Sequence, residues 1–378
     1  LLCIGAEFGD NKFPCTNLYI RDTLKNTRLA LAQRPTQNSA DYMQQDTAWF
    51  ERQLMDTQVV GEFKPLDNLS VDLRAGYAKS QREAPAEFGI EYVRTNSAGD
   101  PYGQYFINRL DANRGDAEIV YSDLKEDLYS FGADVTFRPM PDLGLSVGYA
   151  YQRTMRDSVR RAFQFRATST LPGGVDMLRP DLLLSPSVIL PAAGANGVRP
   201  WQITLIEDDT NPAFAARLYN HAGYGKLNWQ ITPDILIDAG ARFEKAKQVV
   251  SPLQVFDVAT SSTAATRINN DYWLPAATIT WQVQPDMQVR ANASKTIARP
   301  QFRELIFQYY FDPETNRQFQ GNPLLQDSEL FNAEARYEWY FAREQRLSVA
   351  GFYKKIDRPI EPFSFIVSDR LVTSFANA

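Results

Sequence analysis

The stretch Trp229-Gln230-Ile231-Thr232-Pro233-Asp234-Ile235 decides the fold, because it describes a tight chain reversal between two extended segments. Proline presets φ for a turn, and aspartate tolerates the backbone conformations that turns require. After the turn, apolar residues recur at every second position, at Ile235, Ile237, Ala239, Ala241 and Phe243. A period of two is that of a β-strand, so this stretch predicts a β-hairpin.

The same motif recurs along the chain. Each copy has an aromatic residue, then a short link, then an aliphatic residue at the start of the next alternating segment. Further copies begin at Phe63, Phe137, Trp281 and Trp339. The last copy is longer and lacks the proline. Alternating segments flank these links as well, and the sequence therefore predicts five hairpins whose short turns lie at one end of a sheet.

Two features distinguish a membrane barrel from a soluble sandwich. The first is charge deep inside the strands, on the face opposite the apolar one. These residues are Asp72, Arg74, Asp134, Asp238, Arg242, Arg290, Glu334 and Arg336. The second is the position of the five aromatic residues beside the turns, which is typical of the aromatic girdle of a membrane barrel. Together they predict an antiparallel transmembrane β-barrel with a wet interior.

The connections at the opposite end of the hairpins are expected to be long. They cover roughly residues 80–123, 157–217, 248–270, 299–328 and 358–369, and several hold proline and glycine clusters. Short periplasmic turns with long extracellular loops are the asymmetry of outer-membrane barrels. Residues 1–51 are the least legible part, and we interpret them as the end of an earlier loop or strand pair.

Composition excludes several other classes of protein. The 378 residues are 44% hydrophobic and 12% aromatic, yet no run approaches the ~18 apolar residues that a membrane helix needs. The net charge is -5 and no basic stripe stands out, so nucleic-acid binding is not expected. The single histidine, His221, is expected to be a strand residue. We expect no catalytic residue, no metal site and no cofactor.

Few residues stand out as binding or covalent sites. Cys3 and Cys15 could form one small loop disulfide in an oxidising compartment, and two unpaired thiols are the alternative. Trp201, Tyr309 and Tyr310 lie in predicted loops and could stack on a ligand. Packing of these long loops on themselves is the alternative for the three aromatic residues.

Residues 290–361 resemble the barrel of TonB-dependent outer-membrane receptors. The resemblance rests on Arg299-Pro300, then Gly321-Asn322-Pro323, then Phe352-Tyr353-Lys354, in that order. It is firm over the last third of the chain and architectural over the rest. It implies a 22-stranded barrel that is closed by an N-terminal plug. Such receptors import scarce ligands, such as ferric siderophores, cobalamin or oligosaccharides, with energy relayed by TonB, ExbB and ExbD.

The sequence departs from that family pattern in two ways. No plug and no TonB box are visible before Leu1, and only about eleven to thirteen strands can be counted. We therefore expect residues 1–378 to be one barrel segment of a larger receptor, without its plug and final strands. It would lie among the lipid and lipopolysaccharide of a bacterial outer membrane. A passive porin-like barrel and a soluble β-rich carbohydrate-binding protein remain as alternatives.

Overall fold

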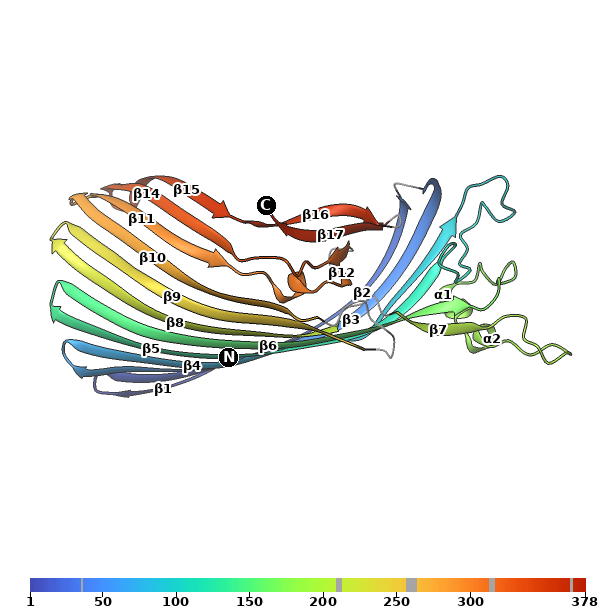
Figure 1. Cartoon of the computed structure of the whole chain (residues 1–378), viewed down its shortest axis with the longest axis horizontal. Coiled ribbons are helices and arrows are strands. Elements are labelled where there is room, and N and C mark those ends of the chain that lie inside the picture. Colours follow the sequence, from blue (N-terminus) through green and yellow to red (C-terminus); the bar gives the residue numbers. More distant parts are fainter. Residues whose placement is uncertain (35–36, 209–212, 256–263, 313–316, 368–369) are drawn as a thin grey trace.

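A computed structural model describes residues 1–378 apart from 35–36, 209–212, 256–263, 313–316 and 368–369. Most of the chain forms one 13-stranded sheet in which neighbours follow the chain order β1-β2-β3-β4-β5-β6-β8-β9-β10-β11-β14-β15, and β7 pairs with β6. Neighbouring strands are antiparallel. Figure 1 shows the sheet curved along its length, with the short turns at the left and the long connections at the right. The all-β barrel architecture predicted from the sequence is confirmed.

The strands of the main sheet are long. Their bounds are β1 (Leu2–Phe8), β2 (Asn11–Arg34), β3 (Gln37–Leu66), β4 (Leu69–Arg94), β5 (Asp116–Met140), β6 (Leu143–Ala167), β7 (Ile203–Asp208), β8 (Ala213–Thr232), β9 (Ile235–Leu253), β10 (Thr266–Gln284), β11 (Met287–Ala298), β14 (Ser328–Ala342) and β15 (Gln345–Asp357). Within the described ranges, no helix reaches the length and hydropathy that a membrane-crossing helix needs.

All five predicted turns are present, and each occupies two residues. They are Asp67-Asn68, Pro141-Asp142, Pro233-Asp234, Pro285-Asp286 and Arg343-Glu344. In the fifth turn, which lacks proline, the chain reverses through Glu344, whose φ is +64°. A further turn joins β1 to β2 at Gly9, with a φ of +61° that glycine adopts readily. Of residues 1–51, which the sequence indicated as the end of an earlier loop or strand pair, the described ones are mostly strands of the same sheet.

Four of the turns are each joined to the next hairpin by a main-chain hydrogen bond. The N–H of Arg138 donates to the carbonyl of Asn68 across 2.8 Å, and the N–H of Gln230 donates to that of Asp142 across 2.8 Å. The same bond recurs at the next two turns, from Gln282 to Asp234 and from Tyr340 to Asp286, across 2.7 and 2.8 Å. The repeated sequence motif thus produces a repeated structural unit along this end of the sheet.

The apolar face of the membrane strands is exposed and is not covered by other described parts of the protein. Leu145, Val147 and Tyr149 are 43%, 61% and 43% exposed on alternate positions of β6. One aromatic row on this face lies beside the turns, as predicted. A second row lies higher on the same face and contains the ring pairs Tyr77–Tyr129, Phe243–Trp273 and Phe331–Tyr353. An exposed apolar band between two aromatic rows is the surface that a bilayer covers.

The long connections are shorter than the sequence indicated. The predicted loop over residues 80–123 contracts to residues 95–115, because β4 runs to Arg94 and β5 begins at Asp116. Similar extensions occur in β6 and β9. Beyond the membrane level neither face meets lipid, so the apolar alternation fades while the hydrogen-bonded ladder continues. The connection between β6 and β7 contains two short helices, α1 (Pro180–Leu183) and α2 (Pro186–Ile189).

A second, four-stranded sheet packs inside the curve of the first. Its strands, in spatial order, are β12 (Tyr309–Asp312), β13 (Arg317–Gln320), β17 (Arg370–Asn377) and β16 (Ile360–Val367). The 3-10 helix η1 (Phe302–Leu305) precedes it. Phe302 and Leu305 of η1 and Phe375 of β17 pack with Phe214 and Val250 of the main sheet in one buried cluster. The segment predicted as the loop 299–328 is therefore folded against the inner wall.

Candidate ligand-binding site

The inner face of the sheet is a polar wall. Asp134 on β5 accepts hydrogen bonds from Arg74 on β4 and from the hydroxyl of Tyr224 on β8. Glu244 on β9 is paired with Arg242 across 2.8 Å. The register places these side chains on the face opposite Val147. The eight charges predicted to face a wet interior therefore do so, and seven of them, all but Asp72, lie in ion pairs between described residues.

The Arg299-Pro300 motif joins this wall. Arg299 Nη2 lies 2.8 Å from Glu244 Oε2, so one carboxylate holds two guanidinium groups. The carbonyl of Pro300 accepts a hydrogen bond of 2.8 Å from the buried amide of Gln248. The motif ends β11, as the sequence predicted, and it also attaches the segment that follows to β9.

A hollow of about 370 Å³ opens on the inner wall at the membrane level. Its polar lining combines Arg74 and Arg242 with the side chains of Gln58, Gln152 and Asn220. Its size falls within the range of small-molecule sites, roughly 300–1,000 Å³. Amide and guanidinium groups donate hydrogen bonds, and amide oxygens accept them. The lining can therefore bind a polar ligand through several directed hydrogen bonds.

A smaller hollow of about 90 Å³ lies higher on the same wall. Arg28 and Asp46 are paired across 2.7 Å on one side of it, and Arg160 and Glu87 across 3.5 Å on the other. Glu118 also lines this hollow, and none of the described cations forms an ion pair with it within 4.0 Å. Burial raises the pKa of Glu118, which Arg160 opposes and the carboxylates nearby reinforce. This part of the wall therefore combines ion-paired charges with a carboxyl group whose charged form is disfavoured by burial.

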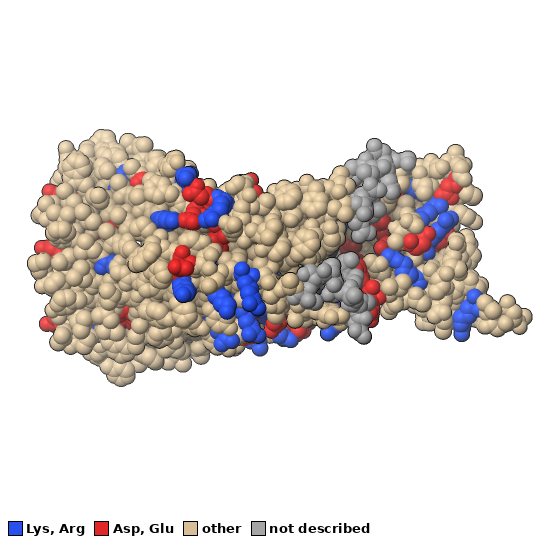
Figure 2. All heavy atoms as spheres, in the orientation of Figure 1, with Lys and Arg blue, Asp and Glu red and all other residues tan. Residues whose placement is uncertain are grey.

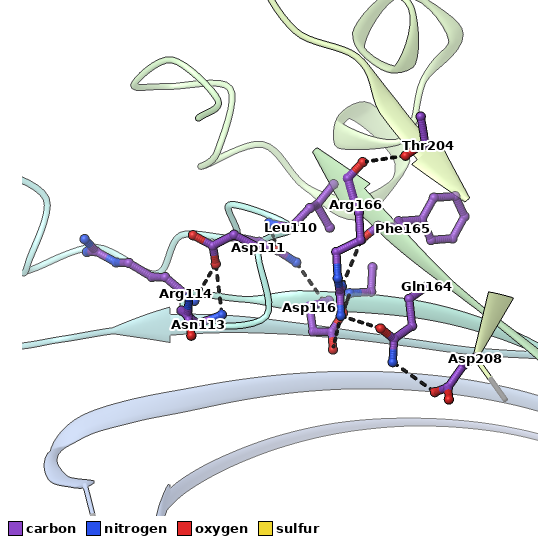
Figure 3. Close-up of polar contacts among 12 residues, drawn as sticks. Leu110, Asp111, Asn113, Arg114, Asp116, Gln164, Phe165, Arg166, Thr204 and Asp208 are labelled. Carbon is purple, nitrogen blue, oxygen red and sulfur yellow. Dashed lines mark hydrogen bonds and ion pairs between the residues drawn. The ribbon is translucent and has the colours of Figure 1, made fainter. Parts of the chain in front are cut away.

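A network of side chains holds the extracellular ends of three strands together (Figure 3). Arg166 on β6 binds the carboxylate of Asp116 on β5 and donates to Gln164 Oε1 across 2.5 Å. Gln164 in turn donates to Asp208 on β7 across 3.0 Å. The hydroxyl of Thr204 donates to the carbonyl of Arg166 across 3.3 Å. These hydrogen bonds join β5, β6 and β7 near Glu118, and we call this network of side chains the extracellular frame.

The sequence matches the family described as "TonB dependent receptor-like, beta-barrel" over residues 21–378. The chain belongs to this family of receptor barrels. No curated protein sequence matches it. The family match agrees with the exposed apolar band and the polar inner wall, neither of which a soluble sandwich requires.

Solved structures similar to this receptor barrel include two siderophore receptors. PirA from Pseudomonas aeruginosa is 11% identical, with a TM-score of 0.44 over 100% of this chain and 59% of that one. PiuA from Acinetobacter baumannii is 13% identical, with a TM-score of 0.47 over 98% and 53%. The ferric-catecholate import receptor Fiu from E. coli K12 is 13% identical, with a TM-score of 0.40 over 99% and 59%. The chain spans a little over half the length of these proteins.

The three aromatic residues singled out from the sequence lie in two different places. Trp201 packs with α1 and α2 on the outer face, and its indole N–H donates to the carbonyl of Val188 across 2.9 Å. Tyr310 stacks on Phe319 with ring centroids 5.5 Å apart. Tyr309 is half-buried and precedes Tyr310 on β12, so it points to the opposite face of the small sheet. The receptor barrel thus uses Trp201 and Tyr310 in packing and leaves Tyr309 as the candidate of the three.

The receptor barrel does not contain the Cys3–Cys15 disulfide, and both thiols are free. Cys3 pairs with Thr16 in the β1–β2 register, whereas Cys15 pairs with Ile4. Residues directly opposite share a face and successive residues alternate, so the two cysteines point to opposite faces of the sheet. A disulfide would require β1 to slip by one residue. His221 lies in β8 as predicted, and a hydrogen bond of 2.7 Å joins its Nδ1 to the hydroxyl of Tyr149.

Proposed function

We propose that this receptor barrel is part of a bacterial outer-membrane protein that takes up a scarce ligand with energy relayed by TonB. The observation that carries the proposal is the division of one sheet into an exposed apolar band and an ion-paired inner wall. The plug and the TonB–ExbB–ExbD contact would be supplied by parts of the protein outside residues 1–378. Ligand entry would begin at the extracellular frame around Glu118.

A ferric siderophore, cobalamin and an oligosaccharide are the proposed ligand classes. Each is too large and too polar to cross lipid, and each presents many hydrogen-bonding groups. The inner wall supplies guanidinium and amide groups in the hollow lined by Arg242 and Asn220. The siderophore receptors with a similar fold support the first class. The amides of the wall suit the other two classes equally well.

Uptake assays on the full-length protein test this proposal. Cells carrying it should accumulate one labelled ligand from a panel of a ferric siderophore, cobalamin and a maltooligosaccharide. Accumulation should disappear when the tonB gene is deleted. Uptake that persists without TonB would favour the passive porin alternative. Recovery of the full-length protein from the periplasm without detergent would favour the soluble carbohydrate-binding alternative.

Wall variants connect the uptake to the site. Asn220→Ala and Gln152→Ala should each weaken binding of the transported ligand by about fivefold, since each removes one hydrogen bond of roughly 1 kcal/mol. Lys64→Ala near the periplasmic turns is the matched control, because its exposed side chain lies outside the hollow. Equal affinity in all three variants would mean that the ligand does not contact this wall.

A further inference from the structure

The small four-stranded sheet has two different faces. Tyr310, Phe319 and Phe375 stack on one another across β12, β13 and β17, with ring centroids 5.5 and 6.0 Å apart. Phe319 and Phe375 also pack in the buried cluster that holds this sheet against the main one. Because successive strand residues point to opposite faces, the residues on either side of these rings point away from the wall, into the interior of the barrel.

The strand register places aromatic, amide and small side chains in two rows on this interior face. Residues that are paired in register share a face of the sheet. One row crosses all four strands and consists of Tyr309, Gln320, Ser374 and Phe363. The next row contains Gln318, Val372 and Phe365. We call these seven residues the aromatic-amide face.

The exposure of the aromatic-amide face leaves its rings and amides accessible. Phe363 is 48% exposed and stacks on Phe365 with ring centroids 5.8 Å apart. Tyr309 and the two glutamines are half-buried, whereas Val372 and Ser374 are buried between them. Three strand spacings of roughly 4.8 Å separate Tyr309 from Phe363, which is about 14 Å in all. Aromatic side chains therefore stand at both margins of the face, with amide groups between them.

The aromatic-amide face contains no charged residue. Glu361 lies two residues before Phe363 on β16, so it shares this face and adds one exposed carboxylate at its margin. Figure 2 shows few charged side chains on the visible surface over β16 and β17, with groups of charged side chains on either side. The main inner wall differs, because Arg74 and Arg242 lie in ion pairs there. The aromatic-amide face therefore suits a ligand without negative charge.

We propose that the aromatic-amide face binds a neutral oligosaccharide. This inference rests on the proposed function and narrows its three ligand classes to one. A sugar ring presents C–H groups on its flat sides, and the negative faces of the Phe363 and Tyr309 rings attract such groups. Its hydroxyl groups both donate and accept hydrogen bonds, as do the amides of Gln318 and Gln320. A strongly anionic ferric siderophore would meet no cation among the seven residues.

The test uses the full-length protein in a neutral detergent, with maltohexaose, xylohexaose and cellohexaose as probes and titration calorimetry as the readout. One or more of the probes should bind. Phe363→Ala should weaken this binding about tenfold, because it removes a stacking ring, and Phe363→Trp should retain it. Gln320→Ala should weaken it about fivefold through the loss of a hydrogen bond. Phe307→Ala is the matched control, because Phe307 is 55% exposed just before β12 and lies outside the aromatic-amide face.

The outcomes separate this inference from the proposed function. Binding of none of the three probes would overturn the inference, and so would equal affinity in the wild type, Phe363→Ala and Gln320→Ala. Each variant should fractionate with the outer membrane and keep a heat-modifiable mobility, and Gln320→Ala decides the matter if Phe363→Ala does not assemble. TonB-dependent uptake of a ferric siderophore or cobalamin, without binding of any sugar, would overturn the inference and leave the proposed function intact. A protein that binds a sugar but takes up no ligand with TonB would contradict the proposed function alone.

Discussion

The indole N–H of Trp339 donates a hydrogen bond of 3.0 Å to the carboxylate of Asp286, so an aromatic residue of one hairpin is attached to the turn of the hairpin before it. The main-chain N–H of the next residue, Tyr340, donates to the carbonyl of the same aspartate across 2.8 Å. Asp286 is therefore held twice by its neighbour. The fifth hairpin lacks proline, and this double attachment fixes its position at the turn end of the sheet.

Replacing Trp339 with phenylalanine tests this attachment. Trp339→Phe keeps an aromatic ring but removes the indole donor, and it should lower the free energy of unfolding by about 1 kcal/mol. Urea unfolding in lipid vesicles measures the change. Trp229→Phe is the control, because the Trp229 indole has no hydrogen-bond partner among the described residues. If both variants lose the same stability, the Asp286 bond contributes nothing.

Adjacent alanines on β10 test which face meets lipid. Ala277 lies midway between Trp281 and Trp273 and shares their face, whereas Ala276 points to the inner wall. Both are exposed. Ala277→Arg should cost roughly 2–4 kcal/mol, as expected for arginine near the bilayer midplane, and Ala276→Arg should cost clearly less. Folding titrations in vesicles give both values, and similar costs would contradict the assignment of the faces.

The nearby inward residue Gly240 is not a suitable partner for such a comparison. A Cβ at this position would lie 2.6 Å from the carbonyl oxygen of Gly225, so any side chain forces a main-chain shift. Gly240→Arg would therefore be costly even on the wet face. Ala276 already carries a Cβ and avoids this effect.

Glu118 should make the stability of the extracellular frame depend on pH, in a direction that its pKa shift defines. Its pKa is raised by burial, so the folded state holds the proton more tightly than the unfolded state. The associated stability is present below the unfolded-state pKa and is lost as pH rises through the folded-state pKa. Glu118→Gln, which mimics the protonated form, should flatten this loss in melting curves recorded between about pH 4 and 8.

Asp100→Asn supplies a control of opposite sign for that experiment. The hydrogen bond from Arg114 lowers the pKa of Asp100 to about 2, so its contribution is lost as pH falls. The asparagine variant should change the acid side of the melting profile and leave the neutral side unaltered. A wild-type profile that shows no decline at rising pH, or one that Glu118→Gln leaves unchanged, would contradict the assignment to Glu118.

The cysteines give a direct test of the β1–β2 register. With Cys3 and Cys15 on opposite faces, the full-length protein denatured without reductant should bind one maleimide label at each of the two thiols. Mass spectrometry of the peptides counts these labels. Protection of both cysteines until reductant is added would show that they are bridged, and that β1 is shifted by one residue from the register described.

The sequence predicted the turn end of the fold well, because its information is local. Proline and aspartate in the links, and the aromatic residues before them, act within a few residues of one another. The same local reasoning did not predict where the strands end on the extracellular side. Beyond Arg82 and Asp157 the strands continue without a lipid-facing side, so the periodicity that reveals a membrane strand disappears. Residues 1–51 were difficult to interpret for a related reason, since the alternation of apolar and polar residues is weak there.

The candidate site was less accessible to sequence reasoning. Asp46, Glu87 and Glu118 lie on three different strands, and only the register brings them around one hollow. No spacing along the chain reveals such a convergence. Charge on the polar face of the strands was the available signal, and it identified the wall without showing which groups meet. Trp201 shows why both interpretations of a loop aromatic residue stay open in the sequence, because such a residue can also hold its own loop in place.

The alternation of faces along β10 has a genetic consequence. Deleting one codon within a membrane strand moves every residue beyond it to the other face, so Trp273 and its neighbours would turn inward and charged residues would meet lipid. The same deletion in the connection over residues 95–115 displaces no strand residue across the sheet. Changes of length should therefore accumulate in the extracellular connections, while the spanning strands evolve by substitution at constant length.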